Sequence, residues 1–282
     1  MDFRIAQVSD PHLSRNRAYF QDNWDVFVAM MAEDPPDIVV CSGDLCFDGV
    51  HCPDDLAYAR TQLDRLAVPW LAIPGNHDIG DQPPDLKFRH PVDAEKRARW
   101  LAELGADYWF RDCGAWRLVG LDAMLFDSGL EAEAEQWDWF ERILAARGNR
   151  RVLLFVHKPL YLVDPHESAQ STLHLGARSR QRLFDLAQAH DIAVIASGHL
   201  HRYADMTHRG IQLVWAPALG FVLEGYPAGL DVGHCRPGYV EYRISGDRIA
   251  HRFALSPRLA LNDMRQVMEQ HKSTVYLPPR PL

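Results

Sequence analysis

Short apolar runs alternate with longer amphipathic stretches over most of the chain. The apolar runs are rich in Ile, Val, Leu and Phe and cover residues 3–10, 37–44, 68–78, 150–158 and 191–201. Apolar residues at helical spacing, with polar residues near the start or charges on one face, predict helices at residues 22–33, 54–66, 131–146 and 178–190. Strands that alternate with crossover helices are typical of an α/β sheet, so the sequence predicts one layered α/β domain.

Five further segments show other patterns. Residues 106–123 and 211–255 combine β-branched and aromatic residues with glycine-containing turns, which predicts antiparallel strands added to the sheet. Residues 79–97, 160–178 and 221–238 lack a regular period and are predicted to be long loops. Long loops of a compact domain often bind ligands, so we expect these three to determine substrate choice.

The end of the chain differs from the rest. We predict a main domain over residues 1–257 and a C-terminal extension over residues 258–282, which contains one helix-like segment and a proline-rich end. The apolar face of residues 259–271 leaves two interpretations open. It packs against its own domain, which we favour, or it forms a contact in a homo-oligomer.

Composition and charge narrow the class of protein. The 282 residues are 47% apolar and 24% charged, which is typical of a folded globular protein, and the net charge of −8 argues against a nucleic acid polymer as partner. The five cysteines lack paired spacing and are expected to be reduced thiols. The N-terminus shows no targeting pattern and no apolar run reaches the length of a membrane span, so we expect a cytoplasmic protein without a membrane partner.

Each of the five apolar runs ends in side chains that could bind a metal ion. These residues are Asp10 and His12, then Asp44, then Asn76 and His77, then His157, and last His199 and His201. Ligands of an open α/β sheet bind at the carboxyl ends of its strands, so we expect the side chains to converge. Mixed oxygen and imidazole donors suit Mn, Fe or Zn, and the lack of cysteine among them argues against a structural zinc site of the cysteine type.

The spacing of these residues supports a shared site. Asp10 and His12 are two positions apart, so in an extended turn both side chains can face one ion. His199 and His201 could do the same, or could contact two adjacent ions. Three glycines each lie just before a candidate ligand, where the backbone must turn sharply: Gly43, Gly75 and Gly198.

Five short blocks carry a family resemblance. SDPH, SGDL, PGNHD, VHKP and SGHLH, found in this order between residues 9 and 201, resemble the signature blocks of the calcineurin-like metallophosphoesterase superfamily. The sequence is similar in particular to the bacterial branch that includes the class III cyclic nucleotide phosphodiesterases. The resemblance implies a four-layer αββα sandwich with two divalent or trivalent metal ions at the strand ends.

The same resemblance implies a role for each residue. One ion would be held by Asp10, His12, Asp44 and His201, and the other by Asp44, Asn76, His157 and His199, so that Asp44 bridges the pair. The family motif places His77 near the leaving oxygen, where its imidazole would act as a catalytic group that stabilises or protonates the leaving alkoxide.

Two positions depart from the common family pattern. Many members have an aspartate three residues after the bridging one, where this chain has Phe47 and carries Asp48 one place later. Either a shifted Asp48 orients His77, or His77 lacks that partner. Lys158 could face a substrate phosphate, although we favour a solvated lysine. Loop residues His166 and His174 are weaker candidates for substrate contact.

These features together predict a metal-dependent hydrolase of small phosphodiesters, of the cyclic nucleotide or glycerophosphodiester type. Two cations lower the pKa of a shared water and neutralise phosphoryl oxygens during in-line displacement. The alternatives are a phosphomonoesterase or a nuclease on the same scaffold, and a binding protein that has lost its chemistry. The presence of every expected ligand argues against the last of these.

Overall fold

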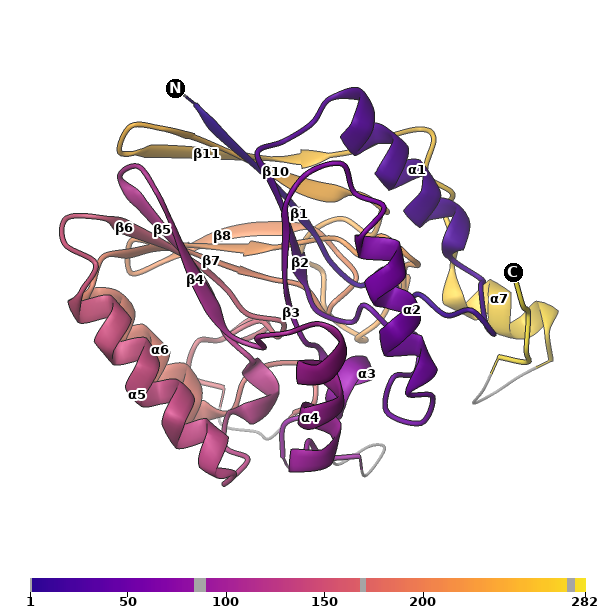
Figure 1. Cartoon of the computed structure of the whole chain (residues 1–282), viewed down its shortest axis with the longest axis horizontal. Helices are drawn as coiled ribbons and strands as arrows, with labels where there is room; N and C mark the ends of the chain where they lie inside the picture. The colour runs from indigo at the N-terminus through magenta and orange to yellow at the C-terminus, as the bar shows by residue number, and fades with distance from the viewer. Residues whose placement is uncertain (1, 84–89, 168–170, 273–276) are drawn as a thin grey trace.

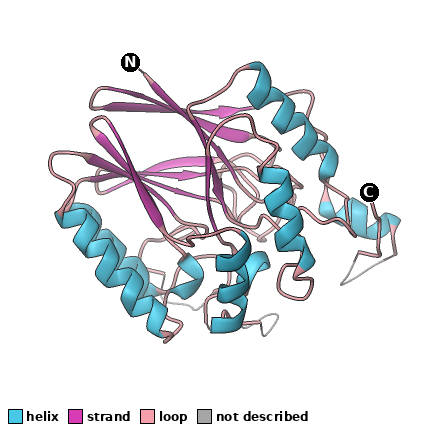
Figure 2. Ribbon diagram, in the orientation of Figure 1, coloured by secondary structure: helices cyan, strands magenta, loops and turns pink. Residues whose placement is uncertain are grey.

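Two mixed β-sheets face each other and carry helices on their outer faces (Figures 1 and 2). The computed structural model describes residues 2–83, 90–167, 171–272 and 277–282. In spatial order the first sheet contains β11 (Arg248–Ala254), β10 (Tyr239–Ser245), β1 (Phe3–Val8), β2 (Ile38–Ser42) and β3 (Trp70–Ile73). The second contains β4 (Trp109–Cys113), β5 (Trp116–Gly120), β6 (Arg151–Phe155), β7 (Ile192–Ser197), β9 (Ile211–Trp215) and β8 (Ala204–His208).

The helices form the outer layers. They are α1 (Gln21–Glu33), α2 (Asp54–Leu63), the single-turn α3 (Asn76–Ile79), α4 (Ala94–Glu103), the 3₁₀ turn η1 (Ala123–Leu125), α5 (Glu131–Ala145), α6 (Ala177–Ala189) and α7 (Met264–Gln270). Helices α1 and α2 lie beside the first sheet, whereas α5 and α6 lie beside the second (Figure 1). This arrangement confirms the predicted four-layer αββα sandwich.

Side chains that alternate in direction along each strand form two buried clusters, one between the two sheets and one between a sheet and its helices. Ile5 of β1 belongs to the buried cluster between the two sheets, together with Val40 of β2 and Phe155 of β6. Its neighbour Ala6 instead joins the cluster that contains Trp24 of α1. Successive residues of a strand point to opposite faces, so one strand supplies both cores.

The four helices predicted from the amphipathic pattern are all present within one to three residues of the expected bounds. Two other expectations need correction. The segment 79–97 was expected to be a loop, but α4 begins at Ala94, because the carboxylate of Asp93 accepts a hydrogen bond from the Lys96 amide at 2.8 Å and Trp100 is fully buried. Residues 84–89 of that segment, like 168–170 of the segment 160–178, lie outside the described residues.

The second correction concerns the added strands. They were expected to be antiparallel, yet β5 runs parallel to β6 and β9 runs parallel to β7. The expected antiparallel pairing is nevertheless present in part: β4 is antiparallel to β5, β8 to β9, and β10 to both β1 and β11. The hairpins β4–β5 and β8–β9 each join the sheet through one strand only. That strand, β5 or β9, is parallel to its neighbour in the centre of the sheet.

The C-terminal extension packs against the main body. Helix α7 places Met264, Val267 and Met268 on a cluster that includes Phe20 and Phe221, as the favoured interpretation of residues 259–271 expected. The domain boundary at residue 257 stays a prediction. All five cysteines are free. Within the described ranges, no helix is long and apolar enough to cross a membrane.

Candidate metal centre

The carboxyl ends of strands from both sheets meet at one place. The Asp10 amide, just after β1, donates a hydrogen bond to the Gly43 carbonyl at 3.0 Å, which ties the end of β1 to the end of β2. The amide of His199, just after β7, donates to Oδ2 of Asp10 at 3.0 Å. The site therefore lies between the two sheets, where residues 189 positions apart in sequence come into contact.

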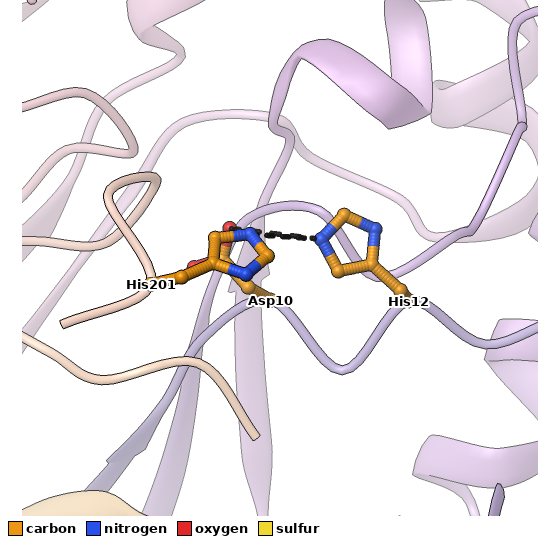
Figure 3. Close-up of side chains that lie close together, drawn as sticks. All are labelled: Asp10, His12 and His201. Carbon is orange, nitrogen blue, oxygen red and sulfur yellow. Dashed lines mark hydrogen bonds and ion pairs between the residues drawn. The ribbon is translucent and has the colours of Figure 1, made fainter. Parts of the chain in front are cut away.

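One group of candidate ligands consists of Asp10, His12 and His201 (Figure 3). The Nε2 atoms of His12 and His201 lie 3.2 Å apart. Oδ1 of Asp10 lies 3.3 Å from Nε2 of His201 and 3.9 Å from Nε2 of His12. All three residues are buried, so three donor atoms converge on a small enclosed volume.

A second group forms around His157. Its Nε2 lies 3.3 Å from Oδ2 of Asp44, 3.2 Å from Nδ1 of His199 and 3.3 Å from Oδ1 of Asn76. The same Oδ2 of Asp44 is 4.0 Å from Nε2 of His12. The Asp44 carboxylate thus stands between the two groups, and the structure brings together all seven predicted ligands.

Backbone carbonyls fix the orientation of the imidazoles. Nδ1 of His157 contacts the Ser42 carbonyl at 2.9 Å, and Nδ1 of His201 contacts the Phe221 carbonyl at 2.8 Å. Nε2 of His199 contacts the Thr172 carbonyl at 2.8 Å. A carbonyl only accepts hydrogen bonds, so each of these nitrogens carries a proton, and in the neutral ring the other nitrogen presents a lone pair to the site.

This pattern fits a cation. Where Nε2 of His201 presents a lone pair, it faces Nε2 of His12 and Oδ1 of Asp10, and that Asp10 oxygen is buried without a hydrogen-bond partner. Buried acceptors that face each other need a proton or a metal ion between them. Oxygen and imidazole donors of this kind suit Mn, Fe or Zn.

The backbone at the site is held in an uncommon conformation. Five candidate ligands have left-handed φ values between 48° and 69°, namely Asp10, His12, Asp44, His199 and His201. Non-glycine residues seldom adopt this region, and such strain concentrates at functional sites, where the surrounding structure over-determines it. Nothing in the residue pattern indicates this feature.

Two glycines allow the crowding. Gly43 has φ +101°, and a Cβ there would lie 2.3 Å from Nδ1 of His157. At Gly75 a Cβ would lie 2.2 Å from Oδ1 of Asp44. Both distances are far below van der Waals contact, so the expectation that these glycines permit close approach of the ligands is confirmed for this pair.

Charges within the site shift the pKa values in opposite directions. Burial lowers the pKa of His157, but the Asp44 and Asp10 carboxylates outweigh it and raise the pKa to about 9. Burial, with the neighbouring imidazoles of His77 and His201, holds the pKa of His12 well below its ordinary value. Burial and the positive charges of His157 and Lys158 do the same for the pKa of His199. The rings of His12 and His199 thus favour the neutral form, which binds a metal.

Asp78 anchors the loops around the site, a role that sequence reasoning missed. Its carboxylate accepts hydrogen bonds from the amides of Gly75 at 2.8 Å, Cys46 at 2.8 Å and Leu45 at 3.2 Å. Burial and the nearby Asp44 charge raise the pKa of Asp78 to about 6. Its position in the PGNHD block was the available signal, because it follows His77 directly.

The candidate catalytic residue His77 lies beside both groups. Its ring centroid is 4.7 Å from that of His12, and its amide donates to Oδ1 of Asp44 at 2.8 Å. Nδ1 of His77 contacts the Phe47 carbonyl at 2.8 Å, whereas Asp48 accepts from Nδ1 of His51 at 2.6 Å. The alternative in which a shifted Asp48 orients His77 is therefore wrong, and His77 lacks a carboxylate partner at that place.

Lys158 does not fit the favoured interpretation of a solvated side chain. It is fully buried and forms an ion pair with Asp81, because a buried ammonium group requires an opposite charge. His174, expected among the surface histidines or as a weak contact residue, is buried and contacts Glu167 at 3.2 Å. His166 is exposed.

This fold and this convergence of carboxylates and imidazoles define a metal-binding phosphoesterase of the calcineurin-like class. The family model described as calcineurin-like phosphoesterase matches residues 3–203, and the chain belongs to that family. It is therefore a member of a hydrolytic superfamily that acts on phosphoesters.

Particular relatives carry different activities in their names. The chain is 26% identical over 225 residues to the serine/threonine-protein phosphatase CPPED1 of Homo sapiens, a match that covers 74% of this chain and 66%, just under two thirds, of that protein. It is 28% identical over 235 residues to the glycerophosphodiester phosphodiesterase GpdQ of Enterobacter lignolyticus, with 76% of each covered. The purple acid phosphatase PPD1 of yellow lupin shares the fold, with a TM-score of 0.67, 18% identity, 93% of this chain and 53% of that chain covered.

Proposed function

We propose that this protein hydrolyses small phosphodiesters with a pair of metal ions. The observation that carries the proposal is the position of Asp44, whose Oδ2 lies 3.3 Å from His157 and 4.0 Å from His12 and so faces both ligand groups. A carboxylate in that place can bridge two cations. The ligands of one ion would be Asp10, His12, Asp44 and His201, and those of the other Asp44, Asn76, His157 and His199.

Such a pair of ions, when bound, lowers the pKa of a water to near neutrality and neutralises phosphoryl oxygens during in-line displacement. The protein supplies orientation. Carbonyls of Ser42, Thr172 and Phe221 fix the rings of His157, His199 and His201, so these ligands need no rearrangement when the substrate arrives.

His77 supplies the proton for the leaving group. Burial acts to lower its pKa, but the Asp44 charge and the Phe47 carbonyl outweigh it, so the pKa of His77 lies above its ordinary value. The charged ring, which carries a proton on Nε2 while Nδ1 stays bonded to Phe47, is therefore more favoured than in a free imidazole. Transfer of the Nε2 proton to the departing alkoxide is general acid catalysis.

Charge at the site favours a diester over a monoester. Lys158 directly follows His157, and Arg202 directly follows His201. Both positively charged side chains already have partners. Lys158 pairs with Asp81, and Arg202 donates to the carbonyls of Leu230 and Val232. A dianionic monoester would gain nothing from these two groups, whereas a diester carries a single negative charge. The name of the Enterobacter relative points to the same class, which includes glycerophosphodiesters and cyclic nucleotides as candidate substrates.

A phosphomonoesterase is the second candidate, and the name of the human relative favours it. Turnover of bis(p-nitrophenyl) phosphate and of p-nitrophenyl phosphate by the Mn²⁺-loaded protein separates the two, with Asp44→Ala as the blank. We expect a higher kcat/KM for the diester. A higher kcat/KM for the monoester would instead identify the protein as a phosphomonoesterase. Activity of Asp44→Ala equal to that of the unaltered protein would overturn the two-ion mechanism.

A further inference from the structure

The described parts of the C-terminal segment, residues 258–272 and 277–282, contact the loop that follows His12 and the loop of residues 219–223, which in turn contacts His201. The segment lies beyond residues 3–203, which the family model matches. Helix α7 and the chain end lie together at one side of the molecule, next to α1 and α2 (Figure 1). The contacts fall into two sets.

The first set joins the segment to residues 219–223, the loop after β9. The Val222 amide donates to the Asn262 carbonyl at 2.8 Å, and the Met264 amide donates to the Val222 carbonyl at 3.1 Å. The side-chain amide of Asn262 donates to the Gly220 carbonyl at 3.0 Å. These bonds enclose Phe221 on both sides.

The second set joins the chain end to residues 15–19, the loop after His12. The Ala18 amide donates to the Arg280 carbonyl at 2.9 Å, and the Arg280 amide donates to the Asn16 carbonyl at 2.7 Å. The Tyr19 hydroxyl donates to the Pro278 carbonyl at 2.9 Å. The segment therefore ties together two loops that are some 200 residues apart in sequence.

Phe221 connects these contacts to the candidate metal centre. Its carbonyl accepts the Nδ1 proton of His201 at 2.8 Å. Its ring centroid lies 4.3 Å from that of His201 and 4.7 Å from that of His12, and the ring is packed in a buried cluster with Phe20, against which Met264 and Met268 of α7 also lie. One residue thus fixes both imidazoles of the Asp10, His12 and His201 group.

The other ligand group is held differently. His157 and His199 are oriented by the Ser42 and Thr172 carbonyls. Among the described residues, no hydrogen bond, ion pair or ring contact joins the segment 258–282 to His157, His199 or Asn76. Any influence of the segment should therefore fall on one ion of the pair.

We propose that the C-terminal segment acts through Phe221 as the positioning element of the Asp10, His12 and His201 group and so sets the affinity of one of the two ions. The inference rests on the proposed two-ion function. Phe221 and the α7 methionines are positioning residues, because they act on the ion through His12 and His201.

The test measures Mn²⁺ binding to the full-length protein by the loss of the free-ion electron paramagnetic resonance signal. Met264→Ser with Met268→Ser removes the apolar face of α7, and Met264→Leu with Met268→Leu is the conservative rescue. Met30→Ser with Met206→Ser is the matched control, because these methionines are also partly buried but pack on the main core. Tyr19→Phe, which removes only the hydroxyl bonded to Pro278, is a milder variant that retains the fold.

Two further variants, each combined with the α7 substitutions, identify which of the two ions is bound more weakly. In Asn76→Ala, which weakens the His157 group, the α7 serine pair should lower the remaining Mn²⁺ affinity about tenfold, whereas the leucine pair and the control pair should not. In His201→Ala the serine pair should leave the remaining affinity within about twofold. Equal loss at both ions, or no loss at either, would overturn the positioning role.

A second measurement separates this outcome from failure of the proposed function. If the unaltered protein binds fewer than two Mn²⁺ ions per chain, the two-ion proposal fails. The imidazole nitrogen resonances of His201 in metal-free protein then still decide the positioning role. They should shift in the serine pair and in Tyr19→Phe, and unchanged resonances would contradict it.

Discussion

The backbone carbonyl of Phe47 accepts a hydrogen bond from Nδ1 of His77 at 2.8 Å. A carbonyl fixes the ring and its tautomer, as a carboxylate would, but adds no full negative charge. Asp48, which directly follows Phe47, does not take this place and instead contacts His51 and Arg17. The orientation of the His77 ring is therefore fixed by a backbone group that no side-chain substitution at position 47 removes.

His77→Ala should retain metal and lose turnover. General acid catalysis contributes about a hundredfold or more, so kcat for a diester with an alkyl leaving group should fall by at least that factor. With p-nitrophenol as the leaving group the loss should be far smaller, because this oxygen departs without a proton. The comparison of the two substrates is the measurement, and His51→Ala, which removes the partner of Asp48, is the control. Equal losses with both leaving groups would rule out the proton-donor role.

Asp44→Asn should lower the metal content and abolish activity. The substitution keeps the size of the side chain, but it removes the negative charge that faces both His12 and His157. Metal analysis after dialysis against a weak chelator should find fewer than two ions per chain. Asp138→Asn, an exposed residue of α5, is the control that should bind metal as the unaltered protein does. Two tightly held ions in Asp44→Asn would contradict a bridging carboxylate.

The order of polar residues along the chain was enough to predict which side chains lie close together, but not their surroundings. Carboxyl ends of parallel strands share an edge, so Asp10 could be placed beside Asp44, and His157 beside His199, from their positions alone. The division of β1, β2 and β3 from β6 and β7 into two sheets could not be derived from periodicity, because a buried strand reads the same in either sheet. The four-layer arrangement came from the family resemblance.

Other features were beyond sequence reasoning for a physical reason. Every residue has a carbonyl, so nothing in the sequence marks those of Thr172 and Phe221 as the partners of His199 and His201. Lys158 looked like a solvated lysine because its partner Asp81 is 77 positions away, in a loop with no regular pattern. Contacts of this kind depend on the folded chain.

Gly75→Ala should impair the site through contact alone. The φ of Gly75 is −115°, which alanine adopts without strain, but the new Cβ would lie 2.2 Å from Oδ1 of Asp44. The Asp44 carboxylate must move, so we expect weaker metal binding and a loss of kcat/KM of at least tenfold. Gly114→Ala is the control, because it has a positive φ and open space around it, and should change stability without changing metal binding. Normal metal affinity in Gly75→Ala would show that the carboxylate position is not critical.

Lys158→Met should destabilise the fold. Removal of one partner from a buried ion pair costs about 3–5 kcal/mol, because the opposite charge is lost while the other group stays buried. The double variant Lys158→Met with Asp81→Asn should recover part of that loss in urea unfolding. Arg258→Met breaks the exposed pair with Glu33 and should change stability by no more than about 1 kcal/mol. Equal stability of the lysine variant and the unaltered protein would show that the buried pair contributes nothing.

Asp122→Asn should make the stability of the fold less dependent on pH. Burial and the neighbouring Asp107 hold the pKa of Asp122 well above its ordinary value, so the folded protein keeps a proton that the unfolded chain releases. Between the two pKa values the folded state therefore binds more protons than the unfolded state, and the stability of the fold falls by up to about 1.4 kcal/mol per pH unit until the folded pKa is reached. Asparagine keeps the oxygen that accepts the Met124 amide at 2.9 Å and removes the ionisation. Urea unfolding between pH 5 and 8 should show a gain in stability for Asp122→Asn that grows with pH, with Asp138→Asn as the exposed control. A difference that stays constant over this range would mean that Asp122 does not hold the proton.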